Sequence, residues 1–158
     1  MGRVYLETSF VSACVTERKD VGSAYRREAS LRWWTEQGPQ NELFVSDEVL
    51  VELSDERYPR RDAALVFVEG IPVITVSAPM VVLARVLVER LVMPKPVGGD
   101  ALHVAMATVS EMEYLLTWNV QHLANPNKLT HLNAVCLEFG LVLPRIVRPD
   151  DLLEVAYE

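Results

Sequence analysis

Short apolar runs rich in β-branched residues alternate along this chain with longer segments of helical character. The runs predict strands at residues 4–6, 43–45, 72–76, 114–117 and 141–143. The segments between them predict helices at residues 22–36, 47–55, 59–69, 79–92, 101–107 and 127–139. Strands that alternate with helices pair in parallel through right-handed crossovers. The sequence therefore predicts an α/β fold with an open, doubly wound parallel sheet of about five strands.

The length and composition fit one globular domain that spans residues 1–158. Of the 158 residues, 50% are hydrophobic, and no repeat or linker-like segment separates two units. Cys14 and Cys136 lie far apart and match no zinc-binding spacing. Two isolated cysteines of this kind are typical of free thiols in a reducing compartment. We therefore expect a single domain without disulfide bonds.

No segment has the pattern of a membrane helix or a secretory signal. The most apolar stretch, residues 71–93, contains two prolines and three charged side chains, whereas a membrane helix needs about 20 residues almost free of charge. The first residues include an acid, Glu7, and lack the long apolar core of a signal peptide. We expect a cytoplasmic protein that does not bind a membrane.

The net charge excludes one way of binding nucleic acid. The chain has 22 acidic and 15 basic side chains, for a formal charge of -7, whereas binding by bulk charge requires an excess of Lys and Arg. The basic side chains are scattered among acids and are interpreted individually as ordinary surface; they include Arg26, Arg27, Arg32, Arg57, Arg60 and Arg61. A nuclease that binds phosphate through metal ions stays compatible with the charge.

Polar side chains occur just past the predicted strands or on helices that face them. Glu7 follows the first strand, Glu52 lies one turn into the helix after the second, Asp100 opens a helix, and Asn119 follows the fourth strand. Ligands of open α/β sheets bind at the carboxyl ends of the strands. Carboxylate and amide oxygens are hard ligands suited to Mg²⁺ or Mn²⁺. The four residues are therefore the candidate site.

Each of these residues also has a purely structural interpretation. Asp100 follows two glycines and is a plausible helix N-cap. Glu52 fits the solvated face of a short helix, and Asn119 fits a turn. Glu7 is harder to explain in this way, because an acid directly after a buried strand has little structural reason to be there.

Two histidines lie near the candidate residues in the sequence. His103 is three residues after Asp100 on an apolar helix, which favours a buried or supporting histidine over a metal ligand. His122 lies in the loop after the fourth strand, where it either contacts substrate or holds the loop.

Several common catalytic signatures are absent from the sequence. There is no GxGxxG or GxxxxGK[ST], which argues against nucleotide binding of the Rossmann or P-loop kind. HExxH and GxSxG are also missing, which argues against zinc proteases and α/β-hydrolases. The acid after the first strand has no second acid two residues later, as an aspartyl-phosphate phosphatase would need.

Four blocks of the sequence, at residues 4–9, 45–52, 100–107 and 114–119, resemble the signature blocks of PIN-domain proteins in order and spacing. Within that family the chain is most similar to the VapC-like toxins. The shared features include a Trp33-Trp34 helix and the block Leu-Leu-Thr-Trp-Asn-x-x-His-Leu-Ala-Asn at residues 115–125. The resemblance covers essentially the whole chain.

The resemblance implies a three-layer α/β/α fold and a metal-dependent ribonuclease, usually homodimeric and often paired with a small antitoxin. It places Glu7, Glu52 and Asp100 on the acidic metal-site positions and Asn119 on a position that is commonly Asp. Thr8 and Thr117 occupy the family's small hydroxyl positions that support the site, and His122, from the loop after the fourth strand, is a further supporting candidate. Two departures stand out, because Glu7 replaces the usual Asp and Asn119 replaces a charged ligand by a neutral one. These changes predict weaker metal binding.

The leading hypothesis is an Mg²⁺- or Mn²⁺-dependent endoribonuclease of toxin type. In it Glu7, Glu52 and Asp100 hold metal and orient water, while Asn119 positions a ligand. The alternative is a catalytically weak or inactive PIN-like module that binds RNA or a protein partner. A third hypothesis is a structure-specific DNA nuclease.

Overall fold

The computed structural model describes residues 2–153 and contains a parallel sheet of five strands. The strands are β1 (Arg3–Leu6), β2 (Glu42–Ser46), β3 (Val73–Ile74), β4 (Tyr114–Leu116) and β5 (Arg145–Val147). Their order across the sheet is β3-β2-β1-β4-β5, and every neighbouring pair is parallel. The predicted α/β fold with a five-stranded parallel sheet is therefore confirmed.

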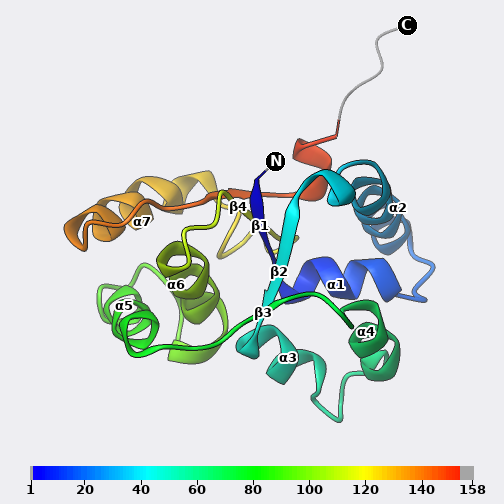
Figure 1. Cartoon of the computed structure of the whole chain (residues 1–158), viewed down its shortest axis with the longest axis horizontal. Helices are drawn as coiled ribbons and strands as arrows, with labels where there is room; N and C mark the ends of the chain where they lie inside the picture. The colour runs from blue at the N-terminus through cyan, green and yellow to red at the C-terminus, as the bar shows by residue number, and fades with distance from the viewer. Residues whose placement is uncertain (1, 154–158) are drawn as a thin grey trace, which may run out of the picture.

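Helices cover both faces of the sheet (Figure 1). They are α1 (Thr8–Val15), α2 (Val21–Glu36), α3 (Asp47–Leu53), α4 (Arg61–Phe67), α5 (Ala78–Glu89), α6 (Leu102–Val109) and α7 (Pro126–Glu138). In Figure 1, α1, α2 and α4 lie on one side of the sheet, whereas α5, α6 and α7 lie on the other. This arrangement is the three-layer α/β/α architecture.

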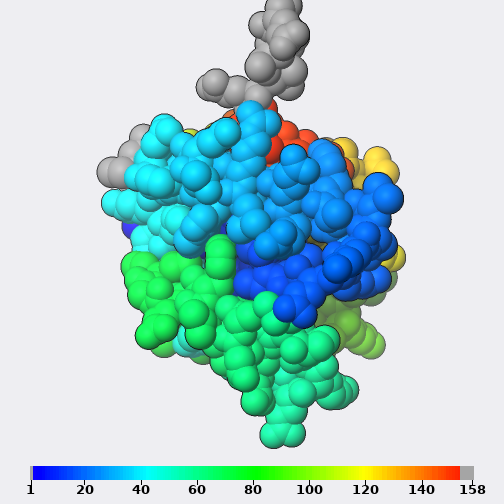
Figure 2. Space-filling model, turned by 90° about the vertical axis from the view of Figure 1, so that its right-hand side faces the viewer, coloured from blue at the N-terminus to red at the C-terminus, as the bar shows by residue number. Residues whose placement is uncertain are grey.

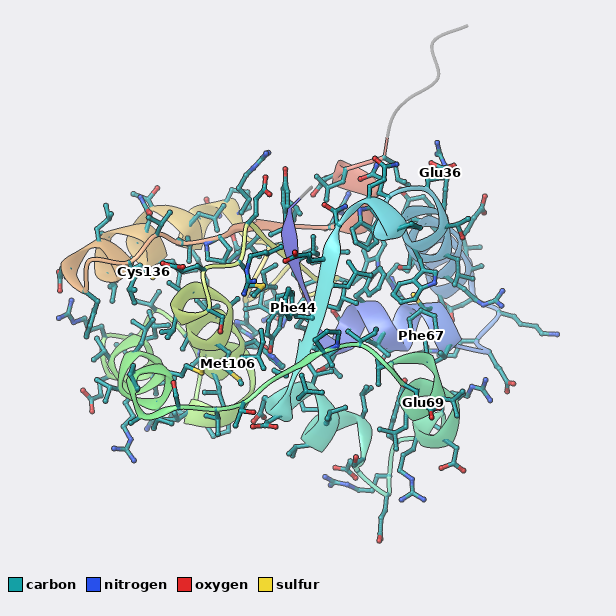
Figure 3. All side chains as sticks on the ribbon, in the orientation of Figure 1. Glu36, Phe44, Phe67, Glu69, Met106 and Cys136 are labelled. Atoms are coloured by element: carbon teal, nitrogen blue, oxygen red, sulfur yellow. The ribbon has the colours of Figure 1, made fainter. Side chains whose placement is uncertain are left out.

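The core forms where both helical layers meet the central strands. Tyr5 and Leu6 of β1 are fully buried, as is Leu115 of β4. On the α2 side, the ring of Trp33 packs edge-on against Phe10 with 5.6 Å between centroids. Figure 3 shows polar side chains at the outer surface, such as Glu36 of α2 and Glu69 in the turn after α4. The central strands β1 and β4 are therefore largely enclosed.

The fifth strand was predicted at residues 141–143, and this is wrong, because β5 begins four residues later at Arg145. The end of α7 explains the shift. Gly140 adopts a positive φ of 69°, and the backbone N–H of Leu141 donates to Cys136 O at 3.0 Å, so Leu141 still belongs to the helix terminus. The ladder with β4 then pairs Tyr114 with Arg145.

Two other segments differ from the predictions. No helix was predicted directly after the first strand, but α1 begins at once at Thr8, because the Glu7 side chain accepts a hydrogen bond from Ser9 N and caps the helix. Strand β3 is shorter than the predicted 72–76. The N–H of Val76 donates to Asp47 Oδ2 at 2.8 Å, so the chain has left the sheet by that point.

Cys14 and Cys136 are both buried and carry free thiols. Burial raises the pKa of the Cys14 thiol to about 12, which keeps it protonated and unreactive at neutral pH. Within residues 2–153, no helix combines the length and the apolar character needed to cross a membrane.

Candidate active site

A cavity of about 710 Å³ opens at the carboxyl ends of the strands. Its lining includes Glu7 after β1, Glu52 on α3, Asp100 before α6 and Asn119 after β4. All strands run in the same direction, so residues from segments far apart in the sequence meet at this edge. The structure thus brings together the four residues that the sequence selected. Their chemical roles stay predictions.

Glu7 is held in place by a set of donors around one of its oxygens. Its side chain is buried, and Oε2 accepts hydrogen bonds from Ser9 N at 3.0 Å, from Thr117 Oγ1 at 2.8 Å and from the Ser9 hydroxyl. The other oxygen, Oε1, has no hydrogen-bond partner among residues 2–153 and lies 4.0 Å from His103 Nε2. Glu7 therefore has a structural role, as the cap of α1, and one carboxylate oxygen available to a ligand.

Glu52 is also oriented through one oxygen. Its Oε1 accepts from Thr8 Oγ1 at 2.6 Å and from His103 Nε2 at 2.5 Å. Partial burial on its own would raise the pKa of Glu52, but the hydrogen bond and charge of His103, together with the Thr8 hydroxyl, outweigh it and lower the pKa below 4.5. Glu52 is therefore ionised at neutral pH.

His103 connects Glu52 to a buried row of polar side chains. The ring is fully buried, and Nδ1 lies 2.6 Å from the Tyr5 hydroxyl. That hydroxyl lies 2.6 Å from Ser46 Oγ, which in turn caps α3 by accepting from Val49 N. Because the ionised carboxylate of Glu52 can only accept, Nε2 carries the proton that is donated to Glu52.

The pKa of His103 is raised above its ordinary value of 6.5. Complete burial would lower it, but the hydrogen bond to Glu52 and the negative charges of Glu7, Glu52 and Glu48 have the larger effect. Ligand atoms of Glu7, Glu52 and His103 lie within 4.8 Å of one another, as those of a metal site do. A protonated Nε2 has no lone pair for a metal, so His103 orients Glu52 and neutralises charge instead. Its supporting role stays a prediction.

Asp100 is presented by a glycine turn. Gly99 has φ of +90° and ψ of −132°, a conformation that favours glycine. Its N–H donates to Glu48 Oε1 at 3.1 Å, which ties the turn to α3. Within residues 2–153 no side-chain hydrogen bond caps this helix, and Asp100 directly follows the non-helical Gly99, so its carboxylate does not act as the helix cap that the sequence also allowed. One contact holds its carboxylate, from Asn119 Nδ2 to Oδ1 at 3.1 Å.

Asn119 serves both the turn and the site. Its Oδ1 accepts from His122 N at 3.0 Å, which closes the turn after β4, while its Nδ2 donates to Asp100. The side chain of His122 lies elsewhere: it is not part of the cavity lining, and its Nδ1 is 3.3 Å from Lys128 Nζ. Of the predicted supporting residues, Thr8 and Thr117 contact the acids and His122 does not.

Further residues of this region were not selected from the sequence. Ser9 lies two residues after Glu7, a spacing at which a capping bond to the acid was recognisable. Glu48, which accepts from Gly99 N, was not selected either. Arg18, Arg26 and Arg60 also line the cavity, but no local pattern marks them, because they come from separate segments that only the folded chain brings together.

The three carboxylates have a composition that fits a divalent cation. Glu7 and Glu52 also belong to a group with ligand atoms within 4.8 Å of one another, whereas Asp100 lines the same cavity outside that group. Glu7, Glu52 and Asp100 each use one oxygen for hydrogen bonds, and within residues 2–153 the second oxygen of each has no such partner. Two charges about 4 Å apart repel by about 4 kcal/mol at an effective dielectric constant of about 20. His103 offsets only part of that repulsion. Hard oxygen ligands of this kind suit Mg²⁺ or Mn²⁺ rather than softer metals.

The sequence matches no protein-family model and no curated protein. Solved structures match over most of its length. VapBC2 from Rickettsia felis, bound to a DNA fragment from its promoter, is 14% identical with a TM-score of 0.61 and covers 92% of this chain and 98% of its own. VapBC-1 from nontypeable Haemophilus influenzae is 13% identical with a TM-score of 0.58, covering 94% and 98%.

A third similar structure is VapC20 from Mycobacterium tuberculosis, a toxin that cleaves the sarcin-ricin loop. It is 20% identical with a TM-score of 0.57 and covers 75% of this chain and 92% of its own. At these identities the likeness is one of fold. The chain therefore has a VapC-like PIN fold, as the resemblance of its motifs predicted.

Proposed function

We propose that this chain, with its VapC-like PIN fold, is a metal-dependent endoribonuclease. The observation that carries the proposal is the group of three carboxylates from three segments, each with one open oxygen, in a single cavity. Because clustered charges are costly without a cation, a site built this way is suited to holding one. The fold likeness to VapC20, which cleaves an RNA, supports RNA as the substrate class.

In this proposal Glu7, Glu52 and Asp100 hold Mg²⁺ or Mn²⁺. The bound metal would supply a nucleophilic hydroxide near neutral pH and stabilise the leaving oxygen of a phosphodiester. Ser9 and Thr117 keep Glu7 in position, and Thr8 and His103 do so for Glu52. Asn119 fixes Asp100 through its amide. The protein's contribution is therefore to orient the carboxylates.

The cellular role that fits this activity is that of the toxin in a type II toxin-antitoxin pair, acting as a homodimer in the cytoplasm. Support comes from the fold likeness to the VapBC structures. We expect a small antitoxin encoded beside this chain to relieve its effect on growth. Co-expression of the neighbouring reading frame with this chain tests the pairing, and unrelieved growth arrest would contradict it.

The test of the activity is metal-dependent cleavage by the purified chain. The substrates are single-stranded RNAs and a sarcin-ricin loop hairpin, each with Mg²⁺, Mn²⁺ or EDTA. We expect metal-stimulated cleavage that Asp100→Asn lowers at least about 100-fold, because loss of even a residue that orients a ligand costs 10–100-fold. The matched control is Asp62→Asn, an exposed acid of α4 outside the cavity. Equal cleavage by Asp100→Asn and the unmodified chain would contradict the proposal.

One observation favours a second function. Asn119 gives the site a neutral amide where the family commonly has an acid, so at most three formal charges face a cation. This composition suits a weak or inactive nuclease that binds RNA or a protein partner. RNA binding without cleavage under any metal condition would support this alternative. Parallel DNA substrates test a third possibility, a structure-specific DNA nuclease.

A further inference from the structure

The cavity extends well beyond the carboxylates, along α1. Thr8, Ser12 and Thr16 all line it, and residues four apart lie on the same face of a helix. The eight residues of α1 span about 12 Å at ~1.5 Å per residue. Glu7 lies at the N-terminal end of this floor. The cavity therefore has a second end, about 12 Å from the acids.

Arginine side chains gather at that second end. Arg60 is anchored at the C-terminus of α1, where its Nε donates to Val15 O at 2.9 Å and its Nη1 pairs with Glu17 at 3.0 Å. Arg18 lies two residues beyond Thr16, the residue that ends α1. Figure 2 shows this face, with α2 above α1 and the α4 segment below it.

A third arginine reaches the same cavity from α2. Arg26 contacts Ser23 Oγ through Nη2 at 3.4 Å. Three arginines thus line a cavity that also holds three acids, in a chain whose net charge is -7. These arginines come from the α1–α2 connection, from α2 and from the start of α4, so no single sequence segment accounts for their meeting in one cavity. Their convergence is a property of the fold.

The existing partners of these arginines leave room for an anion. Arg18 pairs with Asp20 at 3.4 Å, and both side chains are largely exposed. The Glu17 partner of Arg60 is 75% exposed. Exposed ion pairs are weak in water, so neither pair prevents a phosphate from binding. A guanidinium group offers several N–H donors in a plane, which match the oxygens of a phosphate.

The spacing favours a nucleic-acid strand over a single small anion. A strand carries a phosphate at every nucleotide, so one bound at the carboxylates presents others along the cavity. An acidic protein segment would match the arginines but would be repelled at the end that holds Glu7, Glu52 and Asp100. The arginine end is continuous with the site of cleavage and complements its substrate.

We infer that Arg18, Arg26 and Arg60 form a phosphate-binding site that holds the backbone of single-stranded RNA at nucleotides flanking the one that is cut. The inference rests on the proposed ribonuclease function and deepens it. The arginines contact phosphates that do not react. They therefore contribute to binding and leave the chemical step to the carboxylates.

The direct test is RNA affinity as a function of salt. A fluorescein-labelled oligouridine is titrated with the Asp100→Asn chain in Mg²⁺, alone and combined with Arg→Ala changes. Each phosphate contact in a single strand contributes about 0.7 to the slope of log affinity against log salt. We expect the slope to fall by about 0.7 for each arginine replaced and by about 2 for all three.

Matched variants separate the site from general charge and from folding. Arg85→Ala removes the same charge from an exposed position on α5, in the other helical layer (Figure 1), and should leave the slope unchanged. Arg60→Lys keeps the charge but not the planar donors, so it should retain the slope with weaker binding. Thermal unfolding confirms that each variant is folded.

A second test locates the phosphates. Each oligonucleotide carries one uncharged methylphosphonate, placed at a different position in each. The Asp100→Asn chain should bind less tightly when the methylphosphonate replaces a phosphate that flanks the site of cleavage. If Arg60 binds the phosphate at that position, the same methylphosphonate should not weaken binding to the Arg60→Ala variant. With an active chain, the Arg→Ala variants should raise KM and change kcat less than twofold, as expected when an interaction is equally strong before and during reaction.

Several outcomes would overturn the inference. The salt slope could be unchanged in the triple variant, or Arg85→Ala could lower it as much as the variants of the site do. RNA could fail to bind at low salt, or polyglutamate could displace the labelled RNA at a lower concentration than unlabelled RNA does. Failure of the proposed nuclease activity is distinguishable. In that case the binding tests keep their expected pattern while cleavage is absent.

Discussion

The acids of the cavity are positioned in two different ways. Glu7 and Glu52, which we call the inner pair, each accept hydrogen bonds from donors on neighbouring elements. Asp100, the outer acid, accepts one hydrogen bond from Asn119 and owes its place to the turn at Gly99. We infer from this difference that the inner pair contributes to the stability of the fold, whereas the position of the outer acid depends on the backbone conformation at Gly99.

Removing one acid of each kind is the strongest test of the difference between the inner pair and the outer acid. Glu7→Ala leaves Ser9 N, the Ser9 hydroxyl and the Thr117 hydroxyl without their acceptor and removes the cap of α1. Buried donors without partners cost about 1–3 kcal/mol each, partly offset here because the two hydroxyls contact each other. We expect a loss of about 3 kcal/mol in the free energy of unfolding, measured in urea.

Asp100→Ala is the companion variant. It removes a single half-exposed hydrogen bond and relieves repulsion from the inner pair, so the free energy of unfolding should change by less than about 1 kcal/mol. Similar losses in the two variants would show that the distinction between inner pair and outer acid is wrong.

The second prediction concerns the support of the outer acid. Glu48→Ala removes the acceptor of the Gly99 N–H and should lower metal-dependent cleavage about 10–100-fold. Glu48→Gln keeps an oxygen that accepts from Gly99 and should restore most of the activity without the charge. If Glu48→Gln is as inactive as Glu48→Ala, the charge matters rather than the turn, and the outer acid is not positioned in this way.

The third prediction gives the outer acid a charged neighbour. In Asn119→Asp a carboxylate replaces the amide that donates to Asp100 at 3.1 Å, so two carboxylates face each other. Without metal we expect a loss of stability of about 1 kcal/mol, smaller than the full Coulomb repulsion because the side chains can turn toward water. With Mn²⁺ the variant should be stabilised more than the parent chain.

Thermal unfolding with and without Mn²⁺ measures both effects. Asn127→Asp is the control, since that residue is exposed on α7, and it should show neither. A loss that Mn²⁺ leaves unchanged would mean that position 119 does not face a metal.

The smallest expected effect is the pH dependence that His103 gives the inner pair. Its pKa in the folded chain is raised above 6.5, so the folded state retains a proton that the unfolded state loses. Stability from His103 is therefore complete below pH 6.5 and falls as the pH rises through the folded pKa. The lowered pKa of Glu52 has the opposite sign: its contribution is present above pH 4.5 and is lost as the pH falls.

Urea unfolding in EDTA, at pH values from below 6.5 to above the folded pKa of His103, measures the slope with which the free energy of unfolding falls with pH. His103→Gln should flatten it, while His131→Gln, at an exposed position of α7, should not. An unchanged slope in His103→Gln would contradict the assignment of the proton to His103.

The sequence predicted what depends on local pattern. Alternating apolar runs were enough for the parallel sheet, and the rule that ligands bind at strand ends selected Glu7, Glu52, Asp100 and Asn119, which all line the cavity. The boundaries were less predictable. Helix α1 was missed because its first turn depends on capping by Glu7, and β5 was placed too early because the apolar residues 141–143 follow a helix terminus that only the Gly140 conformation defines.

Features that depend on contacts between distant segments could not be predicted from local sequence patterns. The row from Ser46 through Tyr5 to His103 joins three elements, and nothing within one segment indicates it. The same holds for Glu48 and Gly99, and for Arg18, Arg26 and Arg60. Such residues carry ordinary surface or core signals in the sequence, and their roles arise when the sheet brings the segments together.

The place of β1 has a consequence for how the protein is made. It precedes the other four strands in the sequence, yet it lies at the middle of the sheet between β2 and β4. Glu7 at its end obtains the Thr117 hydroxyl only when β4 has joined, and Asn119 is synthesised later still. The four residues of the cavity can therefore come together only after β4 and Asn119 have been synthesised.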